Sequence, residues 1–223
     1  MLVSFLRKKQ IGENVWEFFF APEWPLEYLP GQYVDVTIPD VQQDARGRSR
    51  TFSLTSLPND NFISFATFFP ENSSPFKLKL SSLKPGEQIH VSEAMGDLVL
   101  PRLQTQPLVF VAGGLGVASF VSALRYCKES SLPHPVTLLW ALRNEADKVQ
   151  FPILDTFSFA HRADYIAPER LVATEILELA GQTGLVYVSG SQSFTESLVA
   201  ELRAQGHPDT RLAFDYFTGY QDQ

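Results

Sequence analysis

The spacing of apolar residues changes near residue 102, and this change constrains the fold more than any other feature of the chain. Before it, short segments such as QYVDVTIP (32–39) alternate apolar and polar residues between turns rich in Pro, Gly, Asn and Asp. Evenly spaced segments of this kind predict half-buried strands of a small antiparallel barrel. After it, continuous apolar runs such as LVFVAG (108–113) alternate with segments of helical spacing, which predicts a parallel sheet with crossover helices. We therefore expect two domains, an antiparallel β-barrel over residues 1–101 and an α/β parallel-sheet domain over residues 102–223.

Helices are expected at four places in this plan. SSPFKLKLSSL (73–83) is expected to interrupt the barrel as a short helix, and helical spacing recurs at 116–127, 168–180 and 193–206. HRADYIAPER (161–170) is expected to be a short connection.

Composition excludes several classes of function. A net charge of −7 and a pI of about 5.1 give no electrostatic footprint for nucleic acid. The single cysteine, Cys127, allows neither an internal disulfide nor a protein-bound iron–sulfur cluster, which needs about four thiolates. The four histidines are scattered, so no metal site is expected. The chain has neither a secretory signal pattern nor an apolar run of the ~20 residues that span a bilayer, so we expect a cytoplasmic protein without a transmembrane segment.

Two turns in the second half have the character of a dinucleotide site. The run LVFVAG leads into Gly113-Gly114-Leu115-Gly116, and a helix is expected to begin there. Glycines let the backbone turn tightly and approach a diphosphate, and the helix N-terminus favours that anion. Gly114-x-Gly116-x-x-Ser119 is close to the Rossmann fingerprint, although the acidic residue expected about 20 positions later is missing, and a plain structural turn is the alternative. A second turn, Ser189 to Gln192, ends another expected parallel strand and should line the same crevice.

A concentrated positive loop precedes one strand of the barrel. RGRSRTFSLTS (46–56) holds three arginines within five residues of an acidic chain. A solvated turn is the ordinary interpretation, and we apply it to Arg46 and Arg48. Arg50 is kept apart from them, because its planar donor fork would also suit a phosphate, and the family resemblance described next implies that role.

These motifs, in this order, resemble the ferredoxin–NADP reductase superfamily of flavoprotein reductases over nearly the whole chain. LPGQYVDVTIP resembles an early barrel strand of that family, and RTFS resembles its Arg-x-aromatic-Ser flavin signature. SSPFKLKL is similar to a variant of its diphosphate loop, and AGGLG and VSGS are similar to its two nicotinamide-dinucleotide turns. FDYFTGY resembles the acidic-x-Phe close of some members.

The resemblance implies a set of flavin-binding residues in the barrel. Arg50 would pair with the FAD diphosphate, Phe52 would lie against the isoalloxazine, and Ser53 would hydrogen-bond near flavin N5/O4 as a catalytic residue. The other implied contacts lie beside Arg50, at the far side of the diphosphate and along the flavin's tail: Thr51, Ser74, Phe76, Lys77, Thr67 and Phe69.

The resemblance also implies nicotinamide-binding residues in the second domain. Backbone of the first turn would receive the NAD(P)H diphosphate, and the second turn would shape the nicotinamide end. Arg143 would contact an adenosine phosphate or be a solvated loop residue. Phe217 would cover one flavin face as a catalytic residue, with Tyr220 nearby. The residues of the two turns are Gly113, Gly114, Gly116, Val117 and Ala118, and Ser189, Gly190, Ser191 and Gln192.

The chain departs from the family in its second domain. The family usually has Thr-Pro at Ala118-Ser119, Cys at Ser189 and Pro at Ser191.

The leading hypothesis for function is an enzyme that passes hydride from NAD(P)H to bound FAD and electrons on to a separate acceptor. That acceptor is either a ferredoxin- or flavodoxin-like protein or a small molecule such as free flavin. The departures motivate an alternative, an FAD-binding electron-transfer subunit with a weakened nicotinamide site. The sequence leaves open the acceptor, the choice between NADH and NADPH, FAD against FMN, and the oligomeric state.

Overall fold

Alternating segments of the first half form an antiparallel sheet in a computed structural model that describes residues 1–39, 41–101 and 106–217. Within these residues the sheet has six strands in the order β4-β3-β6-β1-β2-β5. An isolated antiparallel bridge between Leu54 and Phe65 joins its two edges and closes the sheet into the predicted barrel. The elements are β1 (Leu2–Gly12), β2 (Val15–Pro22), β3 (Tyr33–Thr37), β4 (Ser49–Ser53), β5 (Ile63–Phe68), helix α1 (Pro75–Ser82) and β6 (Gln88–Val91).

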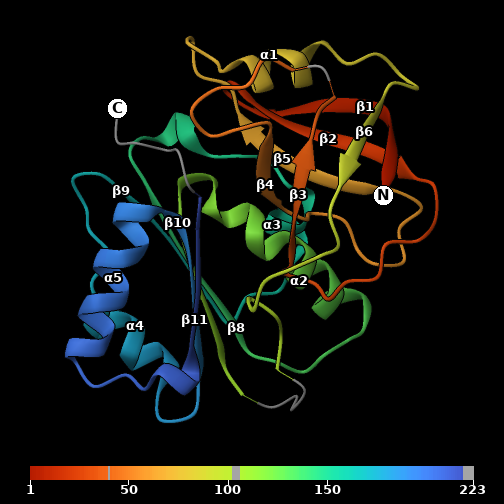
Figure 1. The fold of residues 1–223 in the computed structure, drawn as a ribbon. Helices are drawn as coiled ribbons and strands as arrows, with labels where there is room; N and C mark the ends of the chain where they lie inside the picture. Colours follow the sequence, from red (N-terminus) through yellow and green to blue (C-terminus); the bar gives the residue numbers. More distant parts are fainter. Residues whose placement is uncertain (40, 102–105, 218–223) are drawn as a thin grey trace.

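The barrel core combines phenylalanines with Val, Ile and Leu side chains, and α1 lies over one end of the barrel (Figure 1). The rings of Phe52 and Phe65 stack with centroids 4.4 Å apart. Phe76 of α1 is 1% exposed and stacks on Phe52 at 6.1 Å. Aromatic side chains therefore fix α1 against the strand that carries RTFS.

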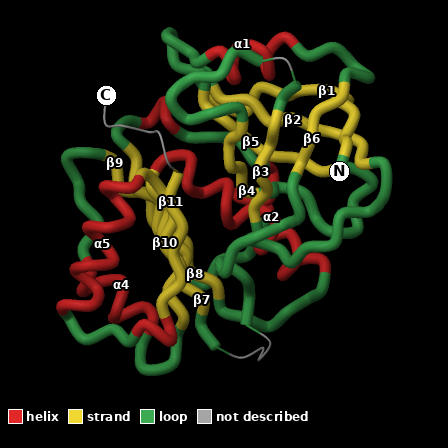
Figure 2. The backbone as a smooth tube through the Cα atoms, in the orientation of Figure 1, coloured by secondary structure: helices red, strands yellow, loops and turns green. Residues whose placement is uncertain are grey.

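The second half forms the predicted parallel sheet, in the order β11-β10-β7-β8-β9. Figure 2 shows α4 and α5 on the face of this sheet away from the barrel, while α2 lies on the face toward it. The elements are β7 (Leu108–Gly113), the 3₁₀ turn η1 (Gly114–Val117), α2 (Ala118–Glu129), β8 (Val136–Leu142), η2 (Glu145–Asp147), α3 (Pro152–Thr156), β9 (His161–Ile166), α4 (Ala173–Ala180), β10 (Leu185–Ser191), α5 (Gln192–Ala204), η3 (Asp209–Arg211) and β11 (Leu212–Phe217).

The two halves share a packed boundary. Ile11 and Val15, at the β1–β2 turn, belong to the same apolar cluster as Phe110 of β7 and Trp140 of β8. The predicted division at residues 101 and 102 adjoins 102–105, which lie outside the described residues, and it stays a prediction.

Two segments differ from the sequence expectations. HRADYI (161–166) is strand β9 and not a connection, and it pairs in parallel with β8. Helix α4 begins at Ala173, whereas the spacing predicted a start at Pro168. Among the described residues, no helix is both long and apolar enough to cross a membrane. The cytoplasmic location stays a prediction.

Candidate functional site

A cationic cluster lies where β4 meets the N-terminus of α1. Ser74 caps that helix, and its Oγ accepts a hydrogen bond from the Lys77 backbone N–H at 3.4 Å. The Arg50 guanidinium carbon lies 5.2 Å from the centre of the ring of Phe76, and Phe76 is the residue that precedes Lys77. Two cationic side chains and the positive end of a helix dipole therefore converge, an arrangement that favours an anion.

Arg50 is almost fully enclosed, with 9% of its side chain exposed. Its Nη2 forms an ion pair with Asp44, and its Nη1 donates to the carbonyls of Arg46, Gly47 and Ser49. Its buried Nε has no hydrogen-bond partner among the described residues. A buried N–H without a partner is costly, and a phosphate oxygen is the kind of acceptor that would satisfy it. Arg46 and Arg48 are exposed, as predicted.

Burial, together with the smaller effect of the charges of Arg46 and Arg50, lowers the pKa of Lys77 to about 8. The Lys77 ammonium donates to the Phe68 carbonyl at 2.6 Å. Near neutral pH the ammonium is charged, but it holds its proton much less firmly than an exposed lysine does. A diphosphate beside it would reverse this effect, since an anion favours the charged form.

This linkage gives a pH prediction for flavin binding. If the diphosphate raises the pKa of Lys77, the protein takes up a proton on binding, and affinity for FAD falls as pH rises above about 8, by up to about tenfold per pH unit. Titrations of flavin fluorescence between about pH 7 and about pH 9.5 measure the slope. Lys77→Met should bind more weakly at neutral pH and lose the slope. A parent protein with constant affinity over this range would contradict the role of Lys77.

The remaining predicted flavin residues are mostly enclosed in the barrel. Phe52 is 7% exposed with its ring stacked on Phe65, and Thr67 is 3% exposed. Phe69 is half-buried and packs near Phe18. Thr51 is exposed and its Oγ1 donates to Asp35 at 2.6 Å. The contacts of these residues with a flavin stay predictions. In the structure, the ring of Phe52 stacks on the ring of Phe65.

Three buried serines connect the two domains. Ser53 of β4 lies 2.9 Å from Ser119 of α2, and Ser119 lies 3.0 Å from Ser189 of β10, in each case between the Oγ atoms. All three side chains are 5% exposed or less. The residue predicted at the reacting edge of the flavin and the residue predicted at the nicotinamide end therefore belong to one hydrogen-bonded chain.

The glycine turn after β7 has the tight geometry that the sequence predicted. Gly114 has φ +53°, and a Cβ added there would meet no atom within 4 Å. Its carbonyl accepts a hydrogen bond from the buried Trp140 indole at 2.8 Å. Gly116 lies against β10, because an added Cβ would be 2.1 Å from the Ser189 carbonyl oxygen. The side chains of Val117 and Ala118 are buried, so these two residues could offer a ligand only backbone groups.

A cavity of about 620 Å³ opens beside this turn. Its lining includes Gly113, Gly114 and Gly116 of the turn and three predicted residues outside it, Arg143, Ser191 and Phe217. Gln192 is exposed, and its side chain donates to Glu196 at 2.8 Å along α5. Gly190 packs against Phe194. Tyr220 lies outside the described residues.

Comparison with known proteins gives relatives and structural neighbours of one kind. No family model matches the chain. It is 26% identical to the toluate 1,2-dioxygenase electron transfer component of Pseudomonas putida, over 86% of this chain and 59% of that protein. Its structure superposes on the ferredoxin-NADP+ reductase of Plasmodium falciparum with a TM-score of 0.81 and 16% identity, covering 97% of this chain and 95% of the reductase. These relatives and structural neighbours are ferredoxin reductase-like oxidoreductases, and the chain shares their fold.

The same fold is found in a third protein. The flavohem-like FAD/NAD binding domain of nitric oxide dioxygenase from Vibrio cholerae matches with a TM-score of 0.78 and 17% identity, over 97% of this chain and 98% of that domain. The predicted family resemblance and the predicted order of a barrel before a parallel sheet are therefore confirmed. The chain spans only 59% of the toluate dioxygenase component, so its own activity is a matter of proposal.

Two departures from the family pattern lie next to each other in space. Ser119 and Ser189 stand where the family usually has Pro and Cys, and in the structure they hydrogen-bond to each other. Because both hydroxyls are completely buried, each needs a hydrogen-bond partner, and Ser119 serves Ser189 while it also contacts Ser53.

Sequence reasoning missed one acidic residue beside this chain of serines. Asp215 of β11 is the parallel neighbour of Ser189, and burial raises the pKa of its carboxyl. The motif FDYF contained it, but only strand register brings it next to the serines. Trp140 was missed for the same reason, since its contact with Gly114 crosses from β8 to the turn after β7.

Proposed function

We propose that this chain binds FAD and NAD(P)H, passes hydride from NAD(P)H to the flavin, and delivers electrons to a separate acceptor. The observation that carries the proposal is the chain Ser53–Ser119–Ser189, with hydrogen bonds of 2.9 and 3.0 Å. It brings together the strand expected to hold the flavin's reacting edge and the strand expected to hold the nicotinamide.

The cationic cluster fits the diphosphate of FAD. The unpartnered Nε of Arg50 offers one donor, Lys77 adds a charge that burial makes costly in the free protein, and the N-terminus of α1 adds its dipole. Flavin would supply the hydride-accepting ring that no side chain of this protein provides. The part left to the protein is to hold that ring and orient it.

The cavity beside Gly114 fits the nicotinamide dinucleotide. The turn offers open space where a side chain would otherwise stand, and Trp140 fixes the Gly114 carbonyl. Arg143 and Arg170, which follow neighbouring strands, line the same cavity and are suited to an adenosine phosphate. Phe217, the strand partner of Ser191, lines the end of the cavity that we assign to the nicotinamide.

Ser53 and Ser189 would orient the two rings, and Asp215 would hold a proton near them. Burial raises the pKa of the Asp215 carboxyl, so it can act as a proton store at higher pH than an exposed aspartate. The hydroxyl of Ser53 can donate to, or accept from, a ring nitrogen, because each hydroxyl has one donor and two acceptor sites.

The acceptor is a separate molecule that the residues of this chain do not identify. The toluate dioxygenase relative is named an electron transfer component, and we propose the same general role here. With Cys127 as its one cysteine, this chain cannot supply the thiolates of an iron–sulfur cluster by itself.

An FAD-binding electron-transfer subunit with a weakened nicotinamide site is the second candidate. One observation favours it. The cavity is lined by two arginines but by four carboxylates, those of Glu13, Asp147, Glu169 and Glu201, and this excess of negative charge opposes a dinucleotide diphosphate.

Anaerobic mixing separates the two candidates. FAD-loaded protein is mixed with NADH and, separately, with NADPH, while the visible flavin absorbance is followed. Loss of the band with either nucleotide supports the reductase. If dithionite bleaches the flavin but neither nucleotide does, the electron-transfer subunit is the correct description.

A further inference from the structure

Helix α2 carries a row of polar side chains that faces the barrel. Ser119, Ser122 and Arg125 are spaced three residues apart and therefore lie along one side of the helix. Ser119 lies 2.9 Å from Ser53, and Ser122 Oγ accepts a hydrogen bond from the Gly31 N–H at 2.9 Å. Each bond joins the second domain to the barrel, and we call the row the polar seam.

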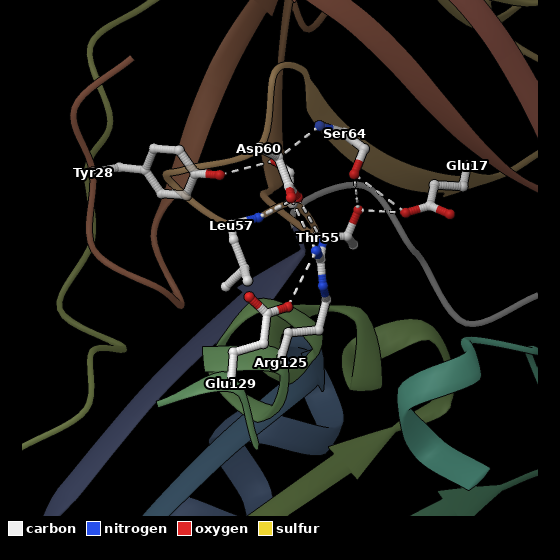
Figure 3. Close-up of polar contacts among 9 residues, drawn as sticks. Glu17, Tyr28, Thr55, Leu57, Asp60, Ser64, Arg125 and Glu129 are labelled. Carbon is white, nitrogen blue, oxygen red and sulfur yellow. Dashed lines mark hydrogen bonds and ion pairs between the residues drawn. The ribbon is translucent and has the colours of Figure 1, made fainter. Parts of the chain in front are cut away.

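An ion pair forms the far end of the polar seam. Arg125 donates from Nη1 and Nη2 to the two carboxylate oxygens of Asp60, at 2.7 and 3.1 Å. Figure 3 shows Arg125 reaching from α2 to Asp60, with Glu129 on its other side. Asp60 is itself held, because its Oδ2 also accepts the Leu57 N–H at 2.8 Å. The side chains of Arg125 and Asp60 are 26% and 18% exposed, so water weakens the pair only in part.

Apolar packing ties α2 to its own sheet, within a cluster that also contains Ile11 and Val15 of the barrel. Phe120 stacks on Phe110 of β7 at 4.6 Å, and Val121 and Leu124 lie in the same cluster. The contacts of the polar seam are directional, so they specify the orientation of α2 against the barrel, where apolar contact would allow sliding. Interfaces between domains of one chain commonly permit such motion.

Movement of α2 would be transmitted to the dinucleotide turn. The helix continues without a break from η1, which contains Gly114 and Gly116. Gly116 has no room to move toward β10 because of its close approach to Ser189. The position of the turn relative to Ser53 therefore depends on how α2 is held against the barrel.

We propose that Arg125 and Asp60 are positioning residues, which act through the polar seam to set the dinucleotide turn against the flavin strand during hydride transfer. The part that concerns hydride transfer rests on the proposed function. A misplacement of about 1 Å between reacting groups can cost about a hundredfold in rate, so a contact at some distance from the rings can matter.

The test compares Arg125→Gln with Arg203→Gln. Arg203 also forms a 2.7 Å ion pair, with Asp209, but this pair is more exposed and lies within the second domain. The first readout is hydrogen exchange of the Gly31 amide in the free protein, since that amide donates to the seam. The second is the anaerobic rate of flavin reduction at saturating nucleotide, with and without deuterium on the transferred position.

We expect Arg125→Gln to raise the rate of Gly31 amide exchange by about tenfold or more. The same variant should slow flavin reduction by about tenfold. Its reduction rate should still fall when the transferred position carries deuterium, and its affinity for FAD should match that of the parent. Arg203→Gln should match the parent in both readouts. Unchanged Gly31 exchange would overturn the seam, and faster exchange with an unchanged reduction rate would overturn its positioning role. Asp60→Asn serves as the second variant if Arg125→Gln does not fold. A parent protein that no nucleotide reduces would refute the proposed function, while Gly31 exchange would still decide whether the seam acts as a unit.

Discussion

Replacing Arg50 with alanine is expected to raise the dissociation constant for FAD by about a hundredfold or more. A hydrogen bond to a charged group contributes about 1.5–3 kcal/mol, and each 1.4 kcal/mol is a factor of ten. The Arg50→Ala protein would lose the hydrogen bonds that Arg50 makes to the FAD diphosphate. It would also release the loop that the Arg50 Nη1 holds through the carbonyls of Gly47 and Ser49.

Two further variants separate the causes of that loss. Arg50→Lys keeps the charge but loses the planar fork, so it should bind FAD with intermediate affinity. Arg48→Ala removes a matched charge from the same loop at an exposed position, and its effect should stay within about threefold because exposed charges contribute little. Equilibrium titration by flavin fluorescence measures all three. Equal losses for Arg50→Ala and Arg48→Ala would show that Arg50 has no special role.

Replacing Gly116 with alanine is expected to slow reduction by NAD(P)H strongly while leaving FAD bound. The new Cβ would lie 2.1 Å from the Ser189 carbonyl oxygen and 2.8 Å from the Gly190 nitrogen. Both atoms belong to backbone, so the dinucleotide turn and the end of β10 must separate. We expect flavin reduction to slow by about a hundredfold, in line with the cost of misplaced reacting groups.

Gly206→Ala is the matched control for that variant. Gly206 has φ +87° with open space around its Cβ position, so it imposes backbone strain far from the turn. Both variants should be checked first by thermal unfolding, and FAD affinity should then be compared. A Gly116→Ala protein that folds and is reduced at the parent rate would contradict the assignment of this turn to the nucleotide.

The sequence predicted the two kinds of sheet because each depends on local patterns. It did not predict β1, where Leu6 to Gln10 are all exposed and so show no alternation of burial. It also did not predict β9, an edge strand whose side chains are mostly half-buried. The start of α4 was placed too early because Leu171 and Val172 continue the apolar spacing, whereas Val172 is extended backbone at the helix cap.

In the candidate site too, local motifs predicted some residues and could not predict others. Contiguous motifs identified Arg50, Lys77 and the glycine turn, whose geometry follows from neighbouring residues. The partners that give these residues their properties lie far away in the chain. The contacts of Ser119 with Ser53 and Ser189 span 66 and 70 residues, and the pair Arg125–Asp60 spans 65. Such contacts depend on how the domains pack, which no local pattern records.

A calorimetric titration of the purified chain with FAD, FMN and riboflavin shows whether Arg50 and Lys77 hold a flavin through its paired phosphates. We expect saturable binding of one FAD per chain and at least about a hundredfold weaker binding of riboflavin, which lacks the phosphates. Equal affinities for FAD and riboflavin, or no binding of any of the three, would contradict this role of Arg50 and Lys77.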